Sequence, residues 1–116
     1  MRDRRWAGVL ACAIATHVTA LGAGFVWLDH AHLEDELAIA RPSQWAGLFT
    51  HGFAGTGYYR PLMALSLSID ALFARGPLLF HLTSIAWHAA AAVLVLKVAE
   101  TFGLTRRASL AAAVPR

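Results

Sequence analysis

The chain has 116 residues, of which 58% are hydrophobic and only 15% are charged. Its mean hydropathy is +0.53, and soluble domains carry roughly one quarter charged residues, so lipid is the expected solvent for most of the chain. The net charge of +3 comes from basic clusters near the ends, which are typical of membrane-helix flanks, and we expect no nucleic-acid partner. The single cysteine, Cys12, excludes an intramolecular disulfide.

The first predicted element is an uncharged run over residues 6–28. As a helix it would extend about 34 Å at 1.5 Å per residue, which exceeds the roughly 30 Å hydrocarbon core of a bilayer. A first transmembrane helix is therefore predicted here, and the run is too long for the apolar core of a cleaved signal peptide. The basic residues Arg2, Arg4 and Arg5 precede it and predict a cytoplasmic N-terminus.

Residues 29–59 are predicted to form an extracytoplasmic loop, because the segment is acidic and follows an outward-running helix. Its carboxylates are those of Asp29, Glu34, Asp35 and Glu36. Within the loop we expect a short interfacial helix over 43–50, with Ser43 as its N-cap. Trp45, Leu48 and Phe49 would share one face of this helix, which suits the membrane interface.

A second transmembrane helix is predicted over 60–75 and a third over 77–98. Pro61 suits the first turn of a helix, where its missing N–H costs nothing. The second segment is short and contains Asp70, so a re-entrant or interfacial helix is its alternative. Residues 99–116 are a tail or the start of a truncated fourth span. The predicted fold is thus an all-α, polytopic membrane protein, and the chain looks like the N-terminal fragment of a longer one.

Two charged residues at the ends of apolar runs are candidates for a catalytic site. Asp29 ends the first run and Arg60 begins the second, so both are expected at the outer membrane surface. A carboxylate there can act as a general base on an acceptor hydroxyl. A guanidinium can neutralise the phosphate of a lipid-linked leaving group through paired hydrogen bonds. This combination favours glycosyl transfer from a polyprenyl-phosphate sugar.

The order of motifs resembles a known family. The pattern is F-V-W-x-D at residues 25–29, then L-F, then Y-Y-R-P-L-x-x-L-S at 58–66, a G-P turn, and F-H-L-x-x-x-x-x-H at 80–88. It is similar to the N-terminal part of the tetratricopeptide-linked transmembrane O-mannosyltransferases. The resemblance covers roughly residues 25–95 and implies a multi-helix enzyme of the C-type glycosyltransferase superfold that uses a polyprenyl-phosphate-linked sugar.

The resemblance also implies site residues. Family members carry a catalytic acid on the first outer loop, which would be Asp29, and usually two adjacent carboxylates; Leu28 replaces the first. Glu34 and Asp35 are possible substitutes. From its charge and position, as argued above, Arg60, with Tyr59 beside it, is expected to contact the lipid phosphate.

No cofactor and no metal site are expected, since the histidines lack a diagnostic ligand spacing. The expected partners are membrane lipid, the lipid-linked donor, and missing downstream helices or another membrane protein, without which the piece should be inactive. The expected location is the inner (plasma) membrane of a bacterium. Two rival readings stay open: a small non-catalytic helical subunit, and a transporter fragment with Asp70 and His81 as a proton relay. His17, His81 and His88 are otherwise expected to hydrogen-bond between helices.

Overall fold

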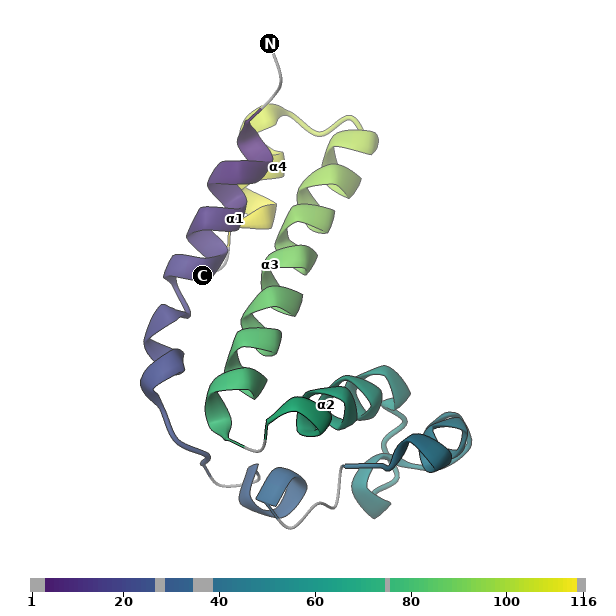
Figure 1. Ribbon diagram of the computed structural model, residues 1–116. Helices are drawn as coiled ribbons and strands as arrows, with labels where there is room; N and C mark the ends of the chain where they lie inside the picture. Colours follow the sequence, from purple (N-terminus) through teal and green to yellow (C-terminus); the bar gives the residue numbers. More distant parts are fainter. Residues whose placement is uncertain (1–3, 27–28, 35–38, 75, 115–116) are drawn as a thin grey trace. The chain divides into compact units, whose positions relative to one another are not determined.

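The computed structural model describes residues 4–26, 29–34, 39–74 and 76–114 (Figure 1). Every regular element in these ranges is a helix, and no strand occurs in them. The all-α prediction is therefore confirmed for the described residues. The chain divides into two compact units, one formed by Met1–Gly22 and His81–Arg116 and the other by Ala23–Phe80.

The first unit is a small helical bundle. It contains α1 (Arg5–Ala15), the 3₁₀ helix η1 (Val18–Gly22), most of α3 (Pro77–Thr101), and α4 (Arg106–Ala113), and α1 and α4 lie alongside α3 (Figure 1). The buried core consists mainly of small side chains: Val9, Ala13, Ala89, Ala92, Leu96 and Ala113. Small residues let helix backbones approach closely, as they do between helices in membranes.

An ion pair closes one end of this bundle. The guanidinium of Arg5 lies 3.0 Å from the carboxylate of Glu100 in the last turns of α3. Both side chains are partly exposed, so the pair contributes little to stability, about 0–1 kcal/mol. It does fix the N-terminal end of α1 to the C-terminal end of α3.

The segment predicted as one helix over 6–28 differs in the structure. Here α1 ends at Ala15, and the shorter η1 follows it. Local side-chain hydrogen bonds explain the break: Thr16 Oγ1 donates to the carbonyls of Cys12 and Ala13, at 3.1 and 3.0 Å, and His17 Nδ1 lies 3.1 Å from the latter. Such bonds compete with the helical ladder. Whether the segment crosses a bilayer stays a prediction.

One described helix is long and apolar enough to cross a membrane. It is α3, with 25 residues and a mean hydropathy of 1.7 over its most apolar window, of which 22% is buried. The other apolar helix, α2 (Pro61–Phe73), has 13 residues and would extend only about 20 Å. The structure thus supplies one candidate span where three were expected, and the number of spans stays a prediction.

The second unit places a short helix against α2. Besides α2 it contains η2 (His30–Glu34), a π-helical turn, and the 3₁₀ helices η3 (Pro42–Phe49) and η4 (Phe53–Gly55). Its core joins Phe53 and Ala64, with Leu48, Ala54 and Leu67 packed around them. Ser68, which is 1% exposed, accepts a 2.8 Å hydrogen bond from the amide of Ala40. This bond fixes the chain entering η3 to the side of α2.

The helix expected over 43–50 starts one residue earlier than predicted. Arg41 stands at its N-cap and Pro42 in its first turn, so the predicted N-cap at Ser43 is wrong. Proline fits the first helical turn because no N–H bond is needed there, which moves the cap to the preceding residue. The indole N–H of Trp45 donates to the carbonyl of Ala40 at 3.1 Å, so this half-buried ring packs against its own unit.

Candidate functional site

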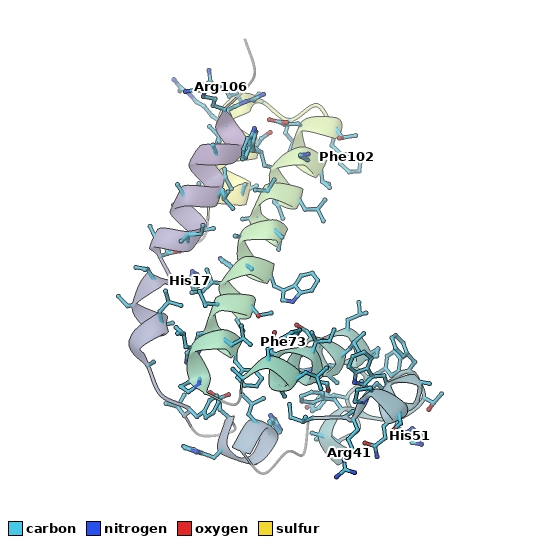
Figure 2. All side chains as sticks on the ribbon, in the orientation of Figure 1. His17, Arg41, His51, Phe73, Phe102 and Arg106 are labelled. Carbon is cyan, nitrogen blue, oxygen red and sulfur yellow. The ribbon has the colours of Figure 1, made fainter. Side chains whose placement is uncertain are left out.

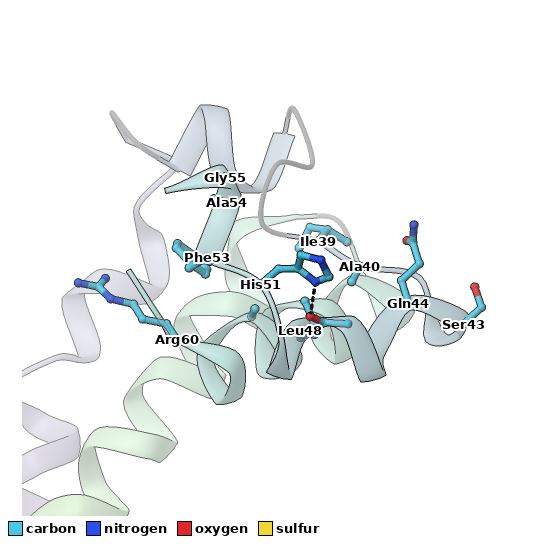
Figure 3. A pocket seen from close by; sticks show the side chains of 13 residues that line it. Ile39, Ala40, Ser43, Gln44, Leu48, His51, Phe53, Ala54, Gly55 and Arg60 are labelled. Atoms are coloured by element: carbon cyan, nitrogen blue, oxygen red, sulfur yellow. Dashed lines mark hydrogen bonds between the residues drawn. The ribbon is translucent and has the colours of Figure 1, made fainter. Parts of the chain in front are cut away.

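A cavity of about 540 Å³ opens in the second unit beside η3, η4 and the start of α2 (Figure 3). Its polar side chains are those of Ser43, Gln44, His51 and Arg60. Apolar side chains complete the wall: Ile39, Leu48, Phe53 and Ala64. The volume lies within the range of roughly 300–1,000 Å³ typical of small-ligand sites, and an apolar wall with a few polar groups is their usual composition. This cavity is the candidate site.

Arg60, the predicted phosphate contact, lies at the edge of this cavity. Its backbone at φ −140° and ψ 57° precedes α2 as the N-cap, because the ring of Pro61 excludes the α conformation from the residue before it. Its guanidinium carbon is 5.2 Å from the centroid of the Tyr58 ring, a cation–π distance. The side chain is exposed and therefore accessible to an incoming phosphate.

Tyr59, the second predicted phosphate contact, has a hydrogen-bond partner within the second unit. Its hydroxyl donates to the carbonyl of Phe49 at 2.9 Å, and its side chain is exposed. The bond connects the segment before α2 to the end of η3. Contact between Tyr59 and a lipid phosphate stays a prediction.

A closed loop forms one wall of the cavity and leads to Arg60. The amide of Phe53 donates to the carbonyl of Tyr58 at 2.6 Å, and the amide of Thr56 donates back to the carbonyl of Phe53 at 2.8 Å. Ala54 and Gly55 adopt positive φ angles of 50° and 72°, and this left-handed backbone is uncommon for alanine. The loop turns the chain tightly enough to bury Phe53 in the wall.

His51 is a cavity residue that sequence reasoning missed. Its Nδ1 lies 2.9 Å from the carbonyl oxygen of Gly47 and 2.9 Å from Thr50 Oγ1, and Figure 3 shows the ring among the lining residues. Thr16 and His17 make the same contacts with the last turn of α1. The sequence did contain a signal for this arrangement: a Thr-His pair directly after a predicted helix. Both side chains can hydrogen-bond to the backbone carbonyls of the last helical turn.

Asp29, the predicted base, is described but does not line the cavity. Its carboxylate accepts a 3.3 Å hydrogen bond from the amide of Val26, and its own amide donates to the Val26 carbonyl at 3.0 Å. Asp29 is half-buried. No contact between Asp29 and Arg60 occurs among the described residues, so their pairing stays a prediction.

The two substitute carboxylates, those of Glu34 and Asp35, lie outside the described structure. Glu34 ends η2, but its side chain lies outside the described structure, as does the whole of Asp35. Asp70 is buried in α2, with 7% of its surface exposed, as expected for a carboxylate that packs against protein instead of lipid. No group of three or more metal-ligating side chains occurs in the part of the chain that the structure describes.

Two histidines of the first unit, His17 and His88, make a tilted ring contact, with an interplanar angle of 52°. The rings of His17 and His88 have centroids 4.3 Å apart. The Nε2 atoms of His81 and His88 are buried without a hydrogen-bond partner among the described residues. Figure 2 shows His17 beside α3 in this unit.

Comparison with known proteins gives one significant relative. The chain is 33% identical over 110 residues to the Protein O-mannosyl-transferase Tmtc2 of Drosophila melanogaster, a match that covers 86% of this chain and 12% of that protein. No protein-family model matches the chain, and no solved structure matches it. The similarity supports the resemblance to transmembrane O-mannosyltransferases, and a membrane location is compatible with it and with α3. The C-type superfold and the bacterial inner membrane stay predictions.

Proposed function

We propose that the chain forms the N-terminal part of an integral membrane glycosyltransferase. It would move a sugar, a mannosyl group by analogy with the relative, from a polyprenyl-phosphate donor to an acceptor hydroxyl on the extracytoplasmic side. The observation that carries the proposal is the exposed guanidinium of Arg60 at the edge of a ligand-sized cavity, in a chain similar to an O-mannosyl-transferase.

The proposed reaction assigns a role to each of the two charged residues. The acceptor oxygen attacks the anomeric carbon of the sugar, and the bond from that carbon to the phosphate oxygen breaks. The lipid phosphate leaves with the electron pair, and Arg60 stabilises its charge through paired N–H donors. Asp29 takes the proton from the acceptor hydroxyl as general base.

The rest of the enzyme would come from outside this chain. The chain spans 12% of the relative's length, and a lipid-linked donor needs more enclosing surface than one small unit offers. Further helices or a membrane partner would complete the donor site.

A transfer assay tests the proposal in membranes from cells that express the complete product of the gene. We expect Arg60→Ala and Asp29→Asn to lower the rate of mannosyl transfer from polyprenyl-phosphate mannose by at least about a hundredfold each. Arg41→Ala is the matched control, because Arg41 is also exposed but does not line this cavity. Wild-type rates in both test variants would refute the assigned roles.

A further inference from the structure

The chemistry of the cavity depends on which nitrogen of His51 carries the proton. Nδ1 lies 2.9 Å from the carbonyl oxygen of Gly47, and a carbonyl oxygen can only accept. Thr50 Oγ1 donates to the same carbonyl at 3.0 Å, which leaves its oxygen free to accept from Nδ1 as well. The Gly47 oxygen also accepts from the backbone N–H groups of Thr50 and His51. A bare Nδ1 would hold its lone pair 2.9 Å from this oxygen, so the hydrogen is assigned to Nδ1. In the neutral ring, Nε2 is then a bare acceptor.

The position of the ring leaves this acceptor accessible to a ligand. His51 lines the cavity, and its Nδ1 edge is bonded to the helix end, so the opposite edge is the one that faces away from η3 (Figure 3). Arg60 lies on the other side of Phe53, and its guanidinium extends away from His51 in the same view. An exposed cation on one side of Phe53 and an exposed hydrogen-bond acceptor on the other suit a ligand with a phosphate at one end and hydroxyl groups at the other.

From this geometry we infer that His51 binds a hydroxyl group of the ligand, which donates a hydrogen bond to Nε2. The inference rests on the proposed function and adds a positioning residue to it. The hydroxyl belongs either to the sugar of the donor or to the side chain of the acceptor, which share this chemistry. The apolar wall formed by Leu48 and Phe53 would pack against the carbon skeleton of the same ligand.

Two substitutions separate ligand binding from a purely structural role. Asparagine places an amide nitrogen near the position of Nδ1, so His51→Asn keeps the bond to Gly47 and loses the outer acceptor. Glutamine reaches to the position of Nε2, so His51→Gln keeps an acceptor and loses the bond to the helix end. If His51 only capped η3, asparagine would be the better replacement. Ligand binding predicts the reverse order.

The test measures binding to the full chain in lipid nanodiscs with three probes: mannose 1-phosphate, methyl phosphate, and N-acetylthreonine methylamide. We expect His51→Asn to weaken mannose 1-phosphate binding by about three- to tenfold, the effect of one neutral hydrogen bond, and to leave methyl phosphate binding unchanged. His51→Gln should stay within about twofold of wild type. If only binding of the threonine probe weakens, the hydroxyl is that of the acceptor. His30→Gln, an exposed histidine that does not line the cavity, is the control.

Nitrogen chemical shifts of labelled His51 give an independent readout. We expect a protonated Nδ1 and a bare Nε2 in the free chain, and a change in the Nε2 shift when a hydroxyl-bearing probe binds. The inference is overturned if His51→Asn binds all probes like wild type, if wild type binds neither hydroxyl-bearing probe, or if Nδ1 is bare. Loss of transfer in Arg60→Ala with unaltered probe binding in His51→Asn would overturn this inference and leave the proposed function intact.

Discussion

Gly52 lies where the chain leaves η3, and it has no room for a side chain. A Cβ atom at this position would overlap the carbonyl oxygen of Thr56, which belongs to the loop closed by the bond from Phe53 to Tyr58. Backbone atoms cannot move aside as a flexible side chain can. The backbone of Gly52 has an ordinary φ of −68°, which any residue can adopt. Glycine is needed here because the closed loop leaves no space for a side chain.

We therefore predict that Gly52→Ala destabilises the second unit. The expected loss in the free energy of unfolding is about 1–3 kcal/mol, as for other overpacked sites. Denaturant titration in detergent micelles measures it, followed by the fluorescence of Trp45 in a background in which the other three tryptophans are replaced by phenylalanine. Gly57→Ala is the matched control, because a Cβ atom at Gly57 meets nothing within 4 Å. An equal effect of the two substitutions would contradict the steric explanation.

At the scale of elements, the sequence predicts a helix best where an apolar segment begins with a residue that favours the first helical turn. Pro61 and Pro77 are the first residues of α2 and α3. Pro61 was expected there because proline fits the first turn, and Pro77 because a Gly-Pro turn precedes the predicted helix over 77–98. The break after Ala15 was not expected. Hydropathy contains no information on the hydrogen bonds that Thr16 and His17 can form with the preceding backbone carbonyls. The same pair of residue types follows η3 as Thr50 and His51.

The α3 helix carries the next prediction, which concerns its insertion into a bilayer. Ala90 is exposed and near the middle of the helix, whereas Thr101 is exposed at its end. We expect Ala90→Arg to raise the apparent free energy of insertion by about 2.5–3.5 kcal/mol, the cost of arginine at a helix centre. Thr101→Arg should have a much smaller effect, because its charge can reach the membrane surface.

Glycosylation mapping in microsomes measures this insertion, with acceptor sites engineered on either side of α3. The inserted fraction should fall for Ala90→Arg and stay near wild type for Thr101→Arg. Equal insertion of the two variants would show that α3 is enclosed by protein or lies outside the hydrocarbon core.

At the scale of the whole molecule, the sequence predicted that charged residues such as Arg60 stand at the ends of apolar segments. It did not predict which side chains line the same cavity. Arg60 was found because its position before Pro61 is a local signal. The cavity itself depends on η3 folding back onto α2 through the bond from Ala40 to Ser68, a contact between residues far apart in the chain. Hydropathy and motif spacing contain no information on such a contact, so His51 was missed.

The last prediction concerns the arrangement of the chain across the membrane, on which the pairing of Asp29 with Arg60 depends. Single cysteines at positions 29, 60 and 76, introduced one at a time in a Cys12→Ala background, would be treated with a membrane-impermeant maleimide in right-side-out and inverted vesicles. A cysteine at Gly76 fits, since a Cβ atom there meets nothing within 4 Å.

We expect positions 29 and 60 to react from the same, extracytoplasmic side, because the proposed base and the proposed phosphate ligand must reach one lipid-linked donor. If α2 spans the bilayer, position 76 reacts only from the opposite side; if α2 is re-entrant or interfacial, it reacts from the same side as position 60. With only about 20 Å of helix in α2, crossing requires the flanking segments to extend through the interface and Arg60 to snorkel. Labelling of positions 29 and 60 from opposite sides would exclude a shared site, and with it the assigned roles in glycosyl transfer.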